Sequence, residues 1–298
     1  MKKRSLAVLM AGVMAASMMT GVVSVYADAD SKTLTVGFDA QYPPFGYKDD
    51  NGEYVGFDLD LAQEVCDNLG WELVKKPINW DSKDMELNSG SIDCIWNGFT
   101  INGREDDYTW SDPYLNNEQV MVVAADSGIE KLDDLAGKNV VVQAASAALD
   151  ALNSDDNKDL TASFASLTEN PDYNTAFMNL DSGAADAIAV DIGVAKYQLS
   201  QREEGKYVIL DEPIQNEQYG IGFKKGNDEL KDLVWDEVKK LDESGEVDKL
   251  AEKYEVADML CIGDDEKSDD KKDDAAEDDA SDADTAKEDT ADTAKDAE

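Results

Sequence analysis

Strand-type and helix-type segments alternate through the first third of the chain, and this order restricts the possible fold more than any other feature. The pattern is strand, helix, strand, helix, strand over residues 33–38, 58–69, 71–78, 82–87 and 92–96. Apolar side chains recur at helical spacing in the helix-type segments, whereas the strand-type segments are short and largely apolar. Such alternation predicts an α/β fold with a parallel sheet and right-handed crossovers.

A second α/β unit is expected after a strand-like segment at residues 119–125. Its strands are predicted at residues 139–142, 161–167 and 187–190, with helices between them. Residues 153–159 are polar and acidic and are predicted to form a turn. They lack the ordered spacing and the glycine of an EF-hand loop.

Both ends of the chain differ from the part expected to fold. Residues 1–27 have a basic start, an apolar stretch and a small-x-Ala ending, which predicts a cleaved secretory signal. An uncleaved anchor is the alternative, because the apolar stretch approaches membrane-spanning length. Residues 264–298 hold 17 acidic and 5 basic residues and no aromatic or branched aliphatic side chain, which predicts a disordered acidic tail. Residues 28–263 suffice for one large domain or two small lobes.

The charge balance excludes several classes of function. The formal net charge is −40, which argues against nucleic acid and anionic membrane surfaces as partners. Histidine is absent, so the commonest general base and the commonest metal ligand are missing. No metal site and no cofactor are expected, and no residue is assigned a catalytic role.

Three cysteines are present, Cys66, Cys94 and Cys261, and their spacings match no zinc site. A secreted chain permits disulfides, with Cys66–Cys94 the first candidate pair. Buried thiols are the favoured alternative, because Cys66 and Cys94 lie in apolar surroundings within a predicted helix and a predicted strand.

Polar residues follow three of the predicted parallel strands. The strands end in Asp39, Trp80 and Asn97, which should emerge at the same edge of the sheet, where ligands bind in open α/β folds. After Asn97, the chain continues through a glycine and a threonine to Arg104. A guanidinium matches a carboxylate with two parallel hydrogen bonds, so Arg104 is a candidate anion-binding residue. The alternative is a surface arginine beside Glu105.

Two candidate residues come from the second unit. Ser146 is predicted at the start of a helix, where free N–H groups attract an anion, or it serves as an ordinary N-cap. Asp191 follows the strand at 187–190 and either caps the next helix or faces an ammonium group.

The order of several short motifs resembles the extracytoplasmic solute-binding proteins of polar amino-acid ABC importers. The resemblance runs from about Leu34 to Tyr254. The matching pieces are Asp39 with Pro43-Pro44-Phe45, Gly56 to Leu61, Ser89 to Asp93, Gly98-Phe99-Thr100, Ser111 to Tyr114, Leu135 to Lys138, Gly183 to Ala187 and Tyr219 to Lys225.

The resemblance implies a two-lobed periplasmic-binding-protein type II fold, in which each lobe has a mostly parallel sheet flanked by helices. Lobe one would comprise residues 28–121 and 222–263, and lobe two residues 122–221. Residues 119–124 and 218–223 would form a two-stranded hinge, and the lobes would close on a ligand as a clamp.

It also implies roles for individual residues. Arg104 would grip the ligand α-carboxylate with help from Gly98, Thr100 and Ser146, and Asp191 would hold the α-ammonium. The side-chain pocket would be lined by Asp39, Tyr42, Trp80 and Asn97.

The sequence departs from the family pattern twice. The run from Gly98 to Arg104 is one residue shorter than usual, and Ala145 stands where a glycine usually precedes the serine or threonine.

The function implied is capture of an L-amino acid, polar or basic, and its delivery to an ABC permease. The protein would be an extracytoplasmic monomer with no lipid-modified N-terminus, because no cysteine lies near the cleavage site. A secreted enzyme on the same scaffold, such as a small-carboxylate dehydratase, and a ligand-sensing module are the alternatives. The enzyme would need Asp39 or another pocket carboxylate as its acid or base.

Overall fold

The first of two large sheets contains the first strand of the described chain. The computed structural model describes residues 32–263, so the predicted signal at 1–27 and the predicted tail at 264–298 both lie outside this range. The strand order is β5-β1-β6-β14-β7. These strands are β1 Thr33–Phe38, β5 Glu72–Pro77, β6 Cys94–Ile95, β7 Tyr108–Trp110 and β14 Gly222–Lys224. β1 pairs in parallel with β5 and β6, whereas β14 runs antiparallel to β6 and β7.

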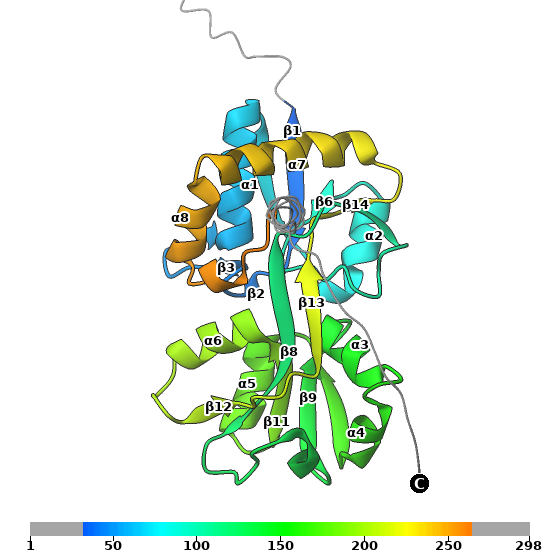
Figure 1. Ribbon diagram of the computed structural model, residues 1–298, viewed down its shortest axis with the longest axis vertical. Coiled ribbons are helices and arrows are strands. Elements are labelled where there is room, and N and C mark those ends of the chain that lie inside the picture. Colours follow the sequence, from blue (N-terminus) through cyan, green and yellow to red (C-terminus); the bar gives the residue numbers. More distant parts are fainter. Residues whose placement is uncertain (1–31, 264–298) are drawn as a thin grey trace, which may run out of the picture. The chain divides into compact units, whose positions relative to one another are not determined.

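Helices and a small sheet accompany this first sheet (Figure 1). The helices are α1 Phe57–Leu69, α2 Lys83–Asn88, α7 Asp228–Glu243 and α8 Glu246–Lys253, with short 3-10 turns η1 Trp80–Ser82 and η3 Ala257–Met259. The small antiparallel sheet consists of β2 Gln41–Tyr42, β3 Gly46–Lys48 and β4 Tyr54–Val55. Helix α1 ends at Leu69, and the left-handed backbone of Gly70 closes it.

The second sheet has the order β10-β9-β11-β8-β12, and β13 also pairs with β8. Its strands are β8 Leu115–Ala124, β9 Asn139–Gln143, β10 Ser166–Asn170, β11 Ala187–Asp191, β12 Tyr207–Ile209 and β13 Gln215–Tyr219. Its helices are α3 Ala147–Asn153, α4 Lys158–Ser163, α5 Tyr173–Asp181 and α6 Ile192–Ser200, with the 3-10 turn η2 Leu132–Leu135. All five residues of the run Ala-Ile-Ala-Val-Asp in β11 are buried, as expected for a central strand.

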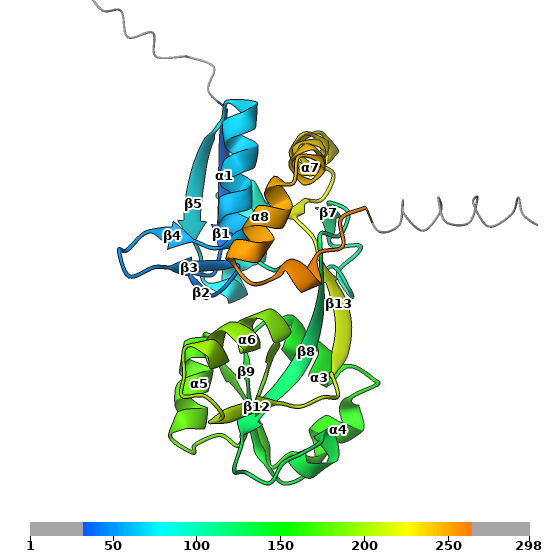
Figure 2. The same cartoon turned by 60° about the vertical axis from the view of Figure 1, so that its left-hand side comes forward.

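Strands β8 and β13 connect the two α/β lobes (Figures 1 and 2). They pair antiparallel from Leu115↔Tyr219 to Gln119↔Gln215. β8 then continues into the second sheet beside β11 and β12, and the chain after β13 enters the first sheet as β14. The fold is therefore the two-lobed type II architecture, with two strands crossing between the lobes.

Two details differ from the sequence-based expectation. Residues 161–167 do not form one strand, because α4 occupies Lys158–Ser163 and only the following residues join β9. The Thr161 hydroxyl donates to the Leu152 carbonyl, and the Ser163 carbonyl accepts from Gly137, so tertiary contacts hold this segment helical. Residues 218–223 are likewise not one strand, because the chain leaves β13 at Tyr219 and enters β14 at Gly222.

The three cysteines, Cys66, Cys94 and Cys261, are buried and no disulfide joins them. Burial raises the pKa of the Cys66 thiol to about 12 and that of Cys94 well above its usual value. The expectation of buried thiols is confirmed, and the Cys66–Cys94 disulfide does not form.

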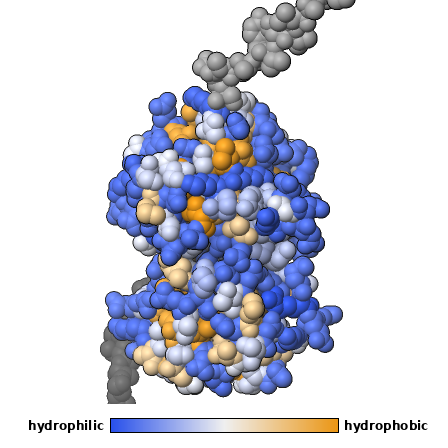
Figure 3. All heavy atoms as spheres, turned by 180° about the vertical axis from the view of Figure 1, so that it is seen from behind, coloured by the Kyte–Doolittle hydropathy of each residue, from blue (hydrophilic) through white to orange (hydrophobic). Residues whose placement is uncertain are grey.

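The surface of the described chain is mostly hydrophilic on the face shown in Figure 3, with small apolar patches. Across residues 32–263, no helix combines the length and the hydropathy that crossing a bilayer requires.

Candidate functional site

A small pocket lies between the two lobes. Tyr42, Trp80, Asn97 and Gly98 line it from the first lobe, and Gln143, Ser146, Ala147 and Asp191 line it from the second. Its volume is about 10 Å³, which is room for roughly one water molecule. A larger guest therefore requires the lobes to move apart. We call this space the inner pocket.

Aromatic rings form one wall of the inner pocket. Tyr42 and Trp80 lie nearly parallel, with ring centroids 6.5 Å apart and an interplanar angle of 6°. Tyr173 from α5 lies 5.9 Å from Tyr42, and its buried hydroxyl has no hydrogen-bond partner within residues 32–263. These rings offer flat apolar surfaces to the aliphatic part of a ligand.

Asp39 and Asn97 link the end of β1 to the second lobe. The Asn97 amide oxygen accepts from the Asp39 N–H at 2.9 Å, and the Asp39 carboxylate accepts from Gln143 Nε2 at 2.7 Å. Burial raises the pKa of Asp39, against the opposing effect of its hydrogen bonds from Gln41 and Gln143. A nearby cation would favour the charged form of this carboxyl.

The backbone of Gly98 is held by the buried carboxyl of Asp58, the second residue of α1. Asp58 accepts from the Gly98 N–H at 2.5 Å and from the Tyr114 hydroxyl at 2.9 Å. Gly98 has φ +53°, and an added Cβ would lie 3.0 Å from the rings of Tyr42 and Tyr219. Only glycine fits this backbone and this space without strain. Burial raises the pKa of Asp58 to about 7.

A buried acidic cluster lies where β8, β11 and β13 meet, and we call it the anionic end. Asp191 Oδ1 accepts from Asn117 Nδ2 at 2.9 Å and from Gln119 Nε2 at 2.7 Å. Glu217 Oε1 accepts from the same two nitrogens, each at 2.8 Å. Tyr219 also donates its hydroxyl to Asp191. The Asp191 side chain does not cap α6, so that alternative is wrong.

Thr100 belongs to this cluster as well. Its hydroxyl donates to Glu217 Oε1 at 2.9 Å, and its backbone forms an isolated bridge with Tyr219. Thr100 is buried but is not among the residues that line the inner pocket.

The opposite charge gathers at what we call the cationic end, where α2 and the loop after β6 meet α3. Arg104 donates to the Asp150 carboxylate at 2.6 Å and lies 5.5 Å from the Phe99 ring. Lys83 is buried, lies 5.2 Å from the Trp80 ring and donates to the Ala145 carbonyl at 3.3 Å. Burial and the nearby guanidinium lower the pKa of Lys83.

Ser146 is the N-cap of α3, and this alternative is confirmed. Its hydroxyl accepts from the Leu149 N–H at 3.2 Å and donates to the Gln143 carbonyl at 2.8 Å. Ala145 before it has φ +54°, a conformation that glycine adopts at lower cost. The backbone before Ser146 is therefore left-handed even though Ala145 stands where the family pattern has a glycine.

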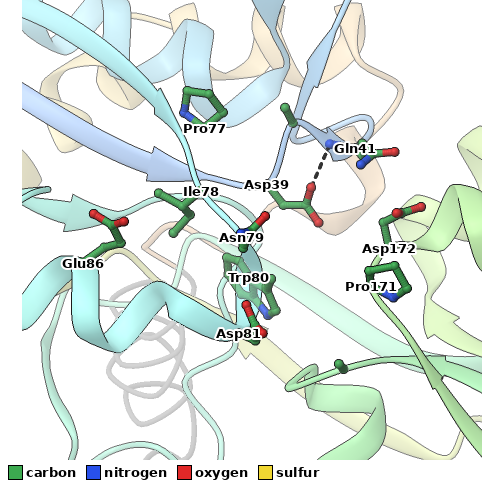
Figure 4. Close-up of a pocket in the computed structure, with 12 residues that line it drawn as sticks. Asp39, Gln41, Pro77, Ile78, Asn79, Trp80, Asp81, Glu86, Pro171 and Asp172 are labelled. Atoms are coloured by element: carbon green, nitrogen blue, oxygen red, sulfur yellow. Dashed lines mark hydrogen bonds between the residues drawn. The ribbon is translucent and has the colours of Figure 1, made fainter.

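A larger cavity of about 690 Å³ adjoins the inner pocket at Trp80. Figure 4 shows Asp39, Trp80 and Asp81 on one side and Pro171 and Asp172 on the other. Its lining is acidic and includes the carboxylates of Asp39, Asp81, Glu86 and Asp172. Glu86 is paired with Lys76. We call this space the outer cavity.

The structure brings six of the nine sequence-predicted residues to the inner pocket, namely Tyr42, Trp80, Asn97, Gly98, Ser146 and Asp191. Asp39 lines the outer cavity, whereas Thr100 and Arg104 are absent from the lining of both cavities.

Sequence reasoning missed Lys83, Asn117, Gln119, Tyr173 and Glu217. One signal existed for the hinge residues, because Leu115, Asn117 and Gln119 are every second residue of β8 and so share one face of the strand. The predicted hinge strands began too late to reveal it.

Comparison with known proteins identifies the class of protein that this fold and site define. The family of bacterial extracellular solute-binding proteins, family 3, matches residues 34–257. The chain belongs to this family.

Its relatives bind different amino acids. The L-cystine-binding protein TcyJ of Escherichia coli K12 is 30% identical over 83% of this chain and 95% of its own length. The arginine-binding extracellular protein ArtP of Bacillus subtilis is 29% identical over 76% of this chain and 88% of its own.

Solved structures agree with this assignment. A substrate-binding protein from Streptococcus pneumoniae with bound histidine is 29% identical, with a TM-score of 0.72 over 74% of this chain and 92% of its own. An ancestral amino-acid-binding protein described as a precursor of cyclohexadienyl dehydratase is 32% identical, with a TM-score of 0.68 over 74% and 95% of the two chains.

Proposed function

We propose that this protein captures a free L-amino acid between its lobes and delivers it to the membrane permease of an ABC importer. One observation carries the proposal: Asp191 lines a pocket between the lobes, and two cations lie outside its lining, Lys83 against the Trp80 ring and Arg104 against Asp150 of α3. A zwitterion needs both charges, and each is costly to bury unpaired. Closure would therefore depend on the presence of a ligand that supplies both partners.

In this proposal Asp191 accepts the α-ammonium, and Arg104, with Lys83, receives the α-carboxylate. Arg104 would exchange Asp150 for the ligand or bind both, since a guanidinium carries five N–H donors. Gly98 and Ser146 border the pocket between the two charged ends, and Tyr42 and Trp80 enclose the ligand stem.

The ligand side chain would extend past Trp80 into the outer cavity. The carboxylates of Asp39, Asp81 and Asp172 line that cavity and favour a cationic or hydrogen-bond-donating end group. Its size also admits a long ligand. We therefore favour a polar or basic amino acid.

The proposed setting is extracytoplasmic, with the protein acting as a monomer that presents its closed form to the permease. The moving bodies would be residues 28–121 with 222–263, and residues 122–221. Closure would bend the chain at β8 and β13, the strands that pass between the lobes.

We propose a receptor without catalytic activity rather than a dehydratase. The best-placed carboxyl for acid–base chemistry, Asp39, accepts hydrogen bonds from Gln41 and Gln143, so both of its oxygens are engaged. Unchanged recovery of small carboxylates after incubation with the protein is the expected result, and product formation would favour the enzyme.

A thermal-shift screen tests the binding function. The chain from residue 28 onward is unfolded and refolded to remove bound ligand, then heated with each common L-amino acid, L-cystine and dicarboxylates. A ligand at 100 times its Kd adds about 2.7 kcal/mol of stability, or roughly 5 to 10 °C for a protein of this size. A shift with one or a few L-amino acids supports the proposal, and no shift with any of them contradicts it.

A further inference from the structure

The anionic end contains one more carboxyl than a single ammonium group needs. Asp191 Oδ1 and Glu217 Oε1 share the same two amide donors, Asn117 Nδ2 and Gln119 Nε2, at 2.7 to 2.9 Å. Because both accept from the same nitrogen, the distance between Asp191 Oδ1 and Glu217 Oε1 cannot exceed the sum of two of these hydrogen-bond lengths. Both side chains are almost completely buried.

No cation offsets this pair within residues 32–263, because neither carboxyl takes part in an ion pair there. Tyr219 donates its hydroxyl to Asp191, and Tyr173 lies near both carboxyls. On the other side of the hinge, Glu217 borders a cavity with Glu118, and Lys196 there is already paired with Asp258 at 2.7 Å.

The two amides add an independent sign that the cluster is incomplete. The buried oxygens Asn117 Oδ1 and Gln119 Oε1 have no hydrogen-bond partner among residues 32–263. Buried amide oxygens are nearly always satisfied in native proteins. Thr100 and Gln215 also donate to Glu217, at 2.9 and 3.2 Å, yet the two amide oxygens still have no donor within residues 32–263. An ammonium group or a proton would add one to the cluster.

We propose that Glu217 is the second carboxyl of the ammonium site and holds a proton in the ligand-free protein, which it releases when a ligand ammonium binds beside Asp191. The inference rests on the proposed function. The balance is simple: the neutral Glu217 carboxyl becomes a carboxylate, the ligand enters with its ammonium intact, and one proton passes to solvent. No other bond forms or breaks.

The physical cause is the cost of two close negative charges in a buried site. Burial, and next the Asp191 charge, raise the pKa of Glu217 to about 7. An arriving ammonium stabilises both ionised carboxyls, so ligand binding and proton release are linked. Binding therefore strengthens as the pH rises towards about 7, the pKa of Glu217 in the ligand-free protein.

Glu217 also has a role in selecting the ligand. A ligand without the ammonium group, such as the matching α-keto acid, would leave the proton in place and gain nothing from the second carboxyl. The site would thus prefer amino acids over their deaminated forms by more than a single aspartate would provide.

The test is isotope-edited infrared spectroscopy on the refolded chain from residue 28 onward, labelled with carboxyl-¹³C glutamate. The only other buried glutamate within residues 32–263 is Glu237, which is paired with Lys240. The ligand-free protein at pH 6 should show the C=O band of a protonated glutamate. That band should be absent in Glu217→Gln and present in the control Glu118→Gln, a neighbouring hinge carboxyl.

An equimolar mixture of the common L-amino acids and L-cystine should then abolish the band. Absence of the band in ligand-free wild-type protein overturns the proposal, as does a band that persists while the mixture raises the melting temperature. A mixture that leaves the melting temperature unchanged instead contradicts the proposed function, and the linked proton release with it. The wild-type spectra decide the question even when Glu217→Gln does not fold.

Discussion

The cationic end and the anionic end of the site reach electrostatic balance in different ways. At the cationic end, Arg104 is already neutralised by Asp150, whose side chain is 65% exposed. At the anionic end, Asp191 and Glu217 are buried, share their hydrogen-bond donors and have no ion-pair partner within residues 32–263. The ligand's ammonium and carboxylate should therefore not contribute equally to the binding affinity.

The cause is solvent access. In the Arg104–Asp150 pair the guanidinium side chain is 12% exposed and the Asp150 side chain 65%. Water competes for the exposed carboxylate, so exchange of Asp150 for a ligand carboxylate is close to balanced. A buried, uncompensated carboxylate gains far more from a new partner, since the local dielectric is low. We therefore expect the ammonium contact to supply most of the affinity and the carboxylate contact to supply selectivity.

Substitution at the anionic end should have the largest effect. Asp191→Asn keeps an acceptor for Tyr219 but removes the charge, so L-amino-acid binding should weaken by about 3 to 5 kcal/mol, the cost of breaking a buried pair. Calorimetric titration with the amino acid that the thermal-shift screen identifies measures it. A loss of less than tenfold would place the ammonium elsewhere.

Arg104→Ala should come next, with a loss of about 2 to 3 kcal/mol for every amino-acid ligand alike, because the α-carboxylate is common to all. Arg202→Ala is a suitable control, since Arg202 is also an arginine over an aromatic ring but belongs to the α6 end, away from the pocket. Retained affinity in Arg104→Ala, or a loss confined to one ligand, would contradict the assignment.

The pH dependence of stability tests the buried carboxyls in the absence of any ligand. The folded-state pKa values of Asp58 and Glu217 are raised to about 7, above their unfolded values. Each group therefore contributes stability that is complete below pH 4 and is lost as the pH rises to about 7, with a slope of up to about 1.4 kcal/mol per pH unit. Melting temperatures across this range should show less decline in Glu217→Gln than in wild type. A parallel decline in both would mean that Glu217 is ionised throughout.

Asp150→Asn should have the smallest effect and the opposite sign. Loss of the exposed carboxylate frees Arg104 for the ligand, so affinity should rise by about 0.2 to 1 kcal/mol at low salt and by less at high salt. A large loss of affinity in the same titration would show instead that Asp150 holds Arg104 in its binding position.

Most of the fold could be predicted from the periodicity of apolar residues and from the residues that end helices and strands. The strand at Thr33–Phe38 has the predicted bounds, and α1 starts one residue earlier than predicted and ends at the predicted residue, Leu69. The segment at 161–167 could not be predicted, because its alternating polar and apolar residues suit a strand while contacts to residues 137 and 152 hold part of it as a helix.

Site residues that directly follow a strand could be predicted. Site residues that only the pairing of distant strands brings together were missed. Asp39, Asn97 and Asp191 follow directly from strand ends. Glu217 and Asn117 lie 100 residues apart in the chain, and only the pairing of β8 with β13 places them opposite each other. Lys83 resembles an ordinary lysine at a helix start until its burial is known.

The sequence by itself determined the class of protein, because hydrophobic periodicity, turn residues and charge are local properties that act before the chain folds. It specified the alternation of strands and helices and the polar residues at strand ends, and its motifs carried the family resemblance. Only the tertiary structure decided which charges are compensated. Burial and distance set the energy of a charge, and both depend on which distant segments meet, as Arg104 does with Asp150 and Glu217 with Asp191.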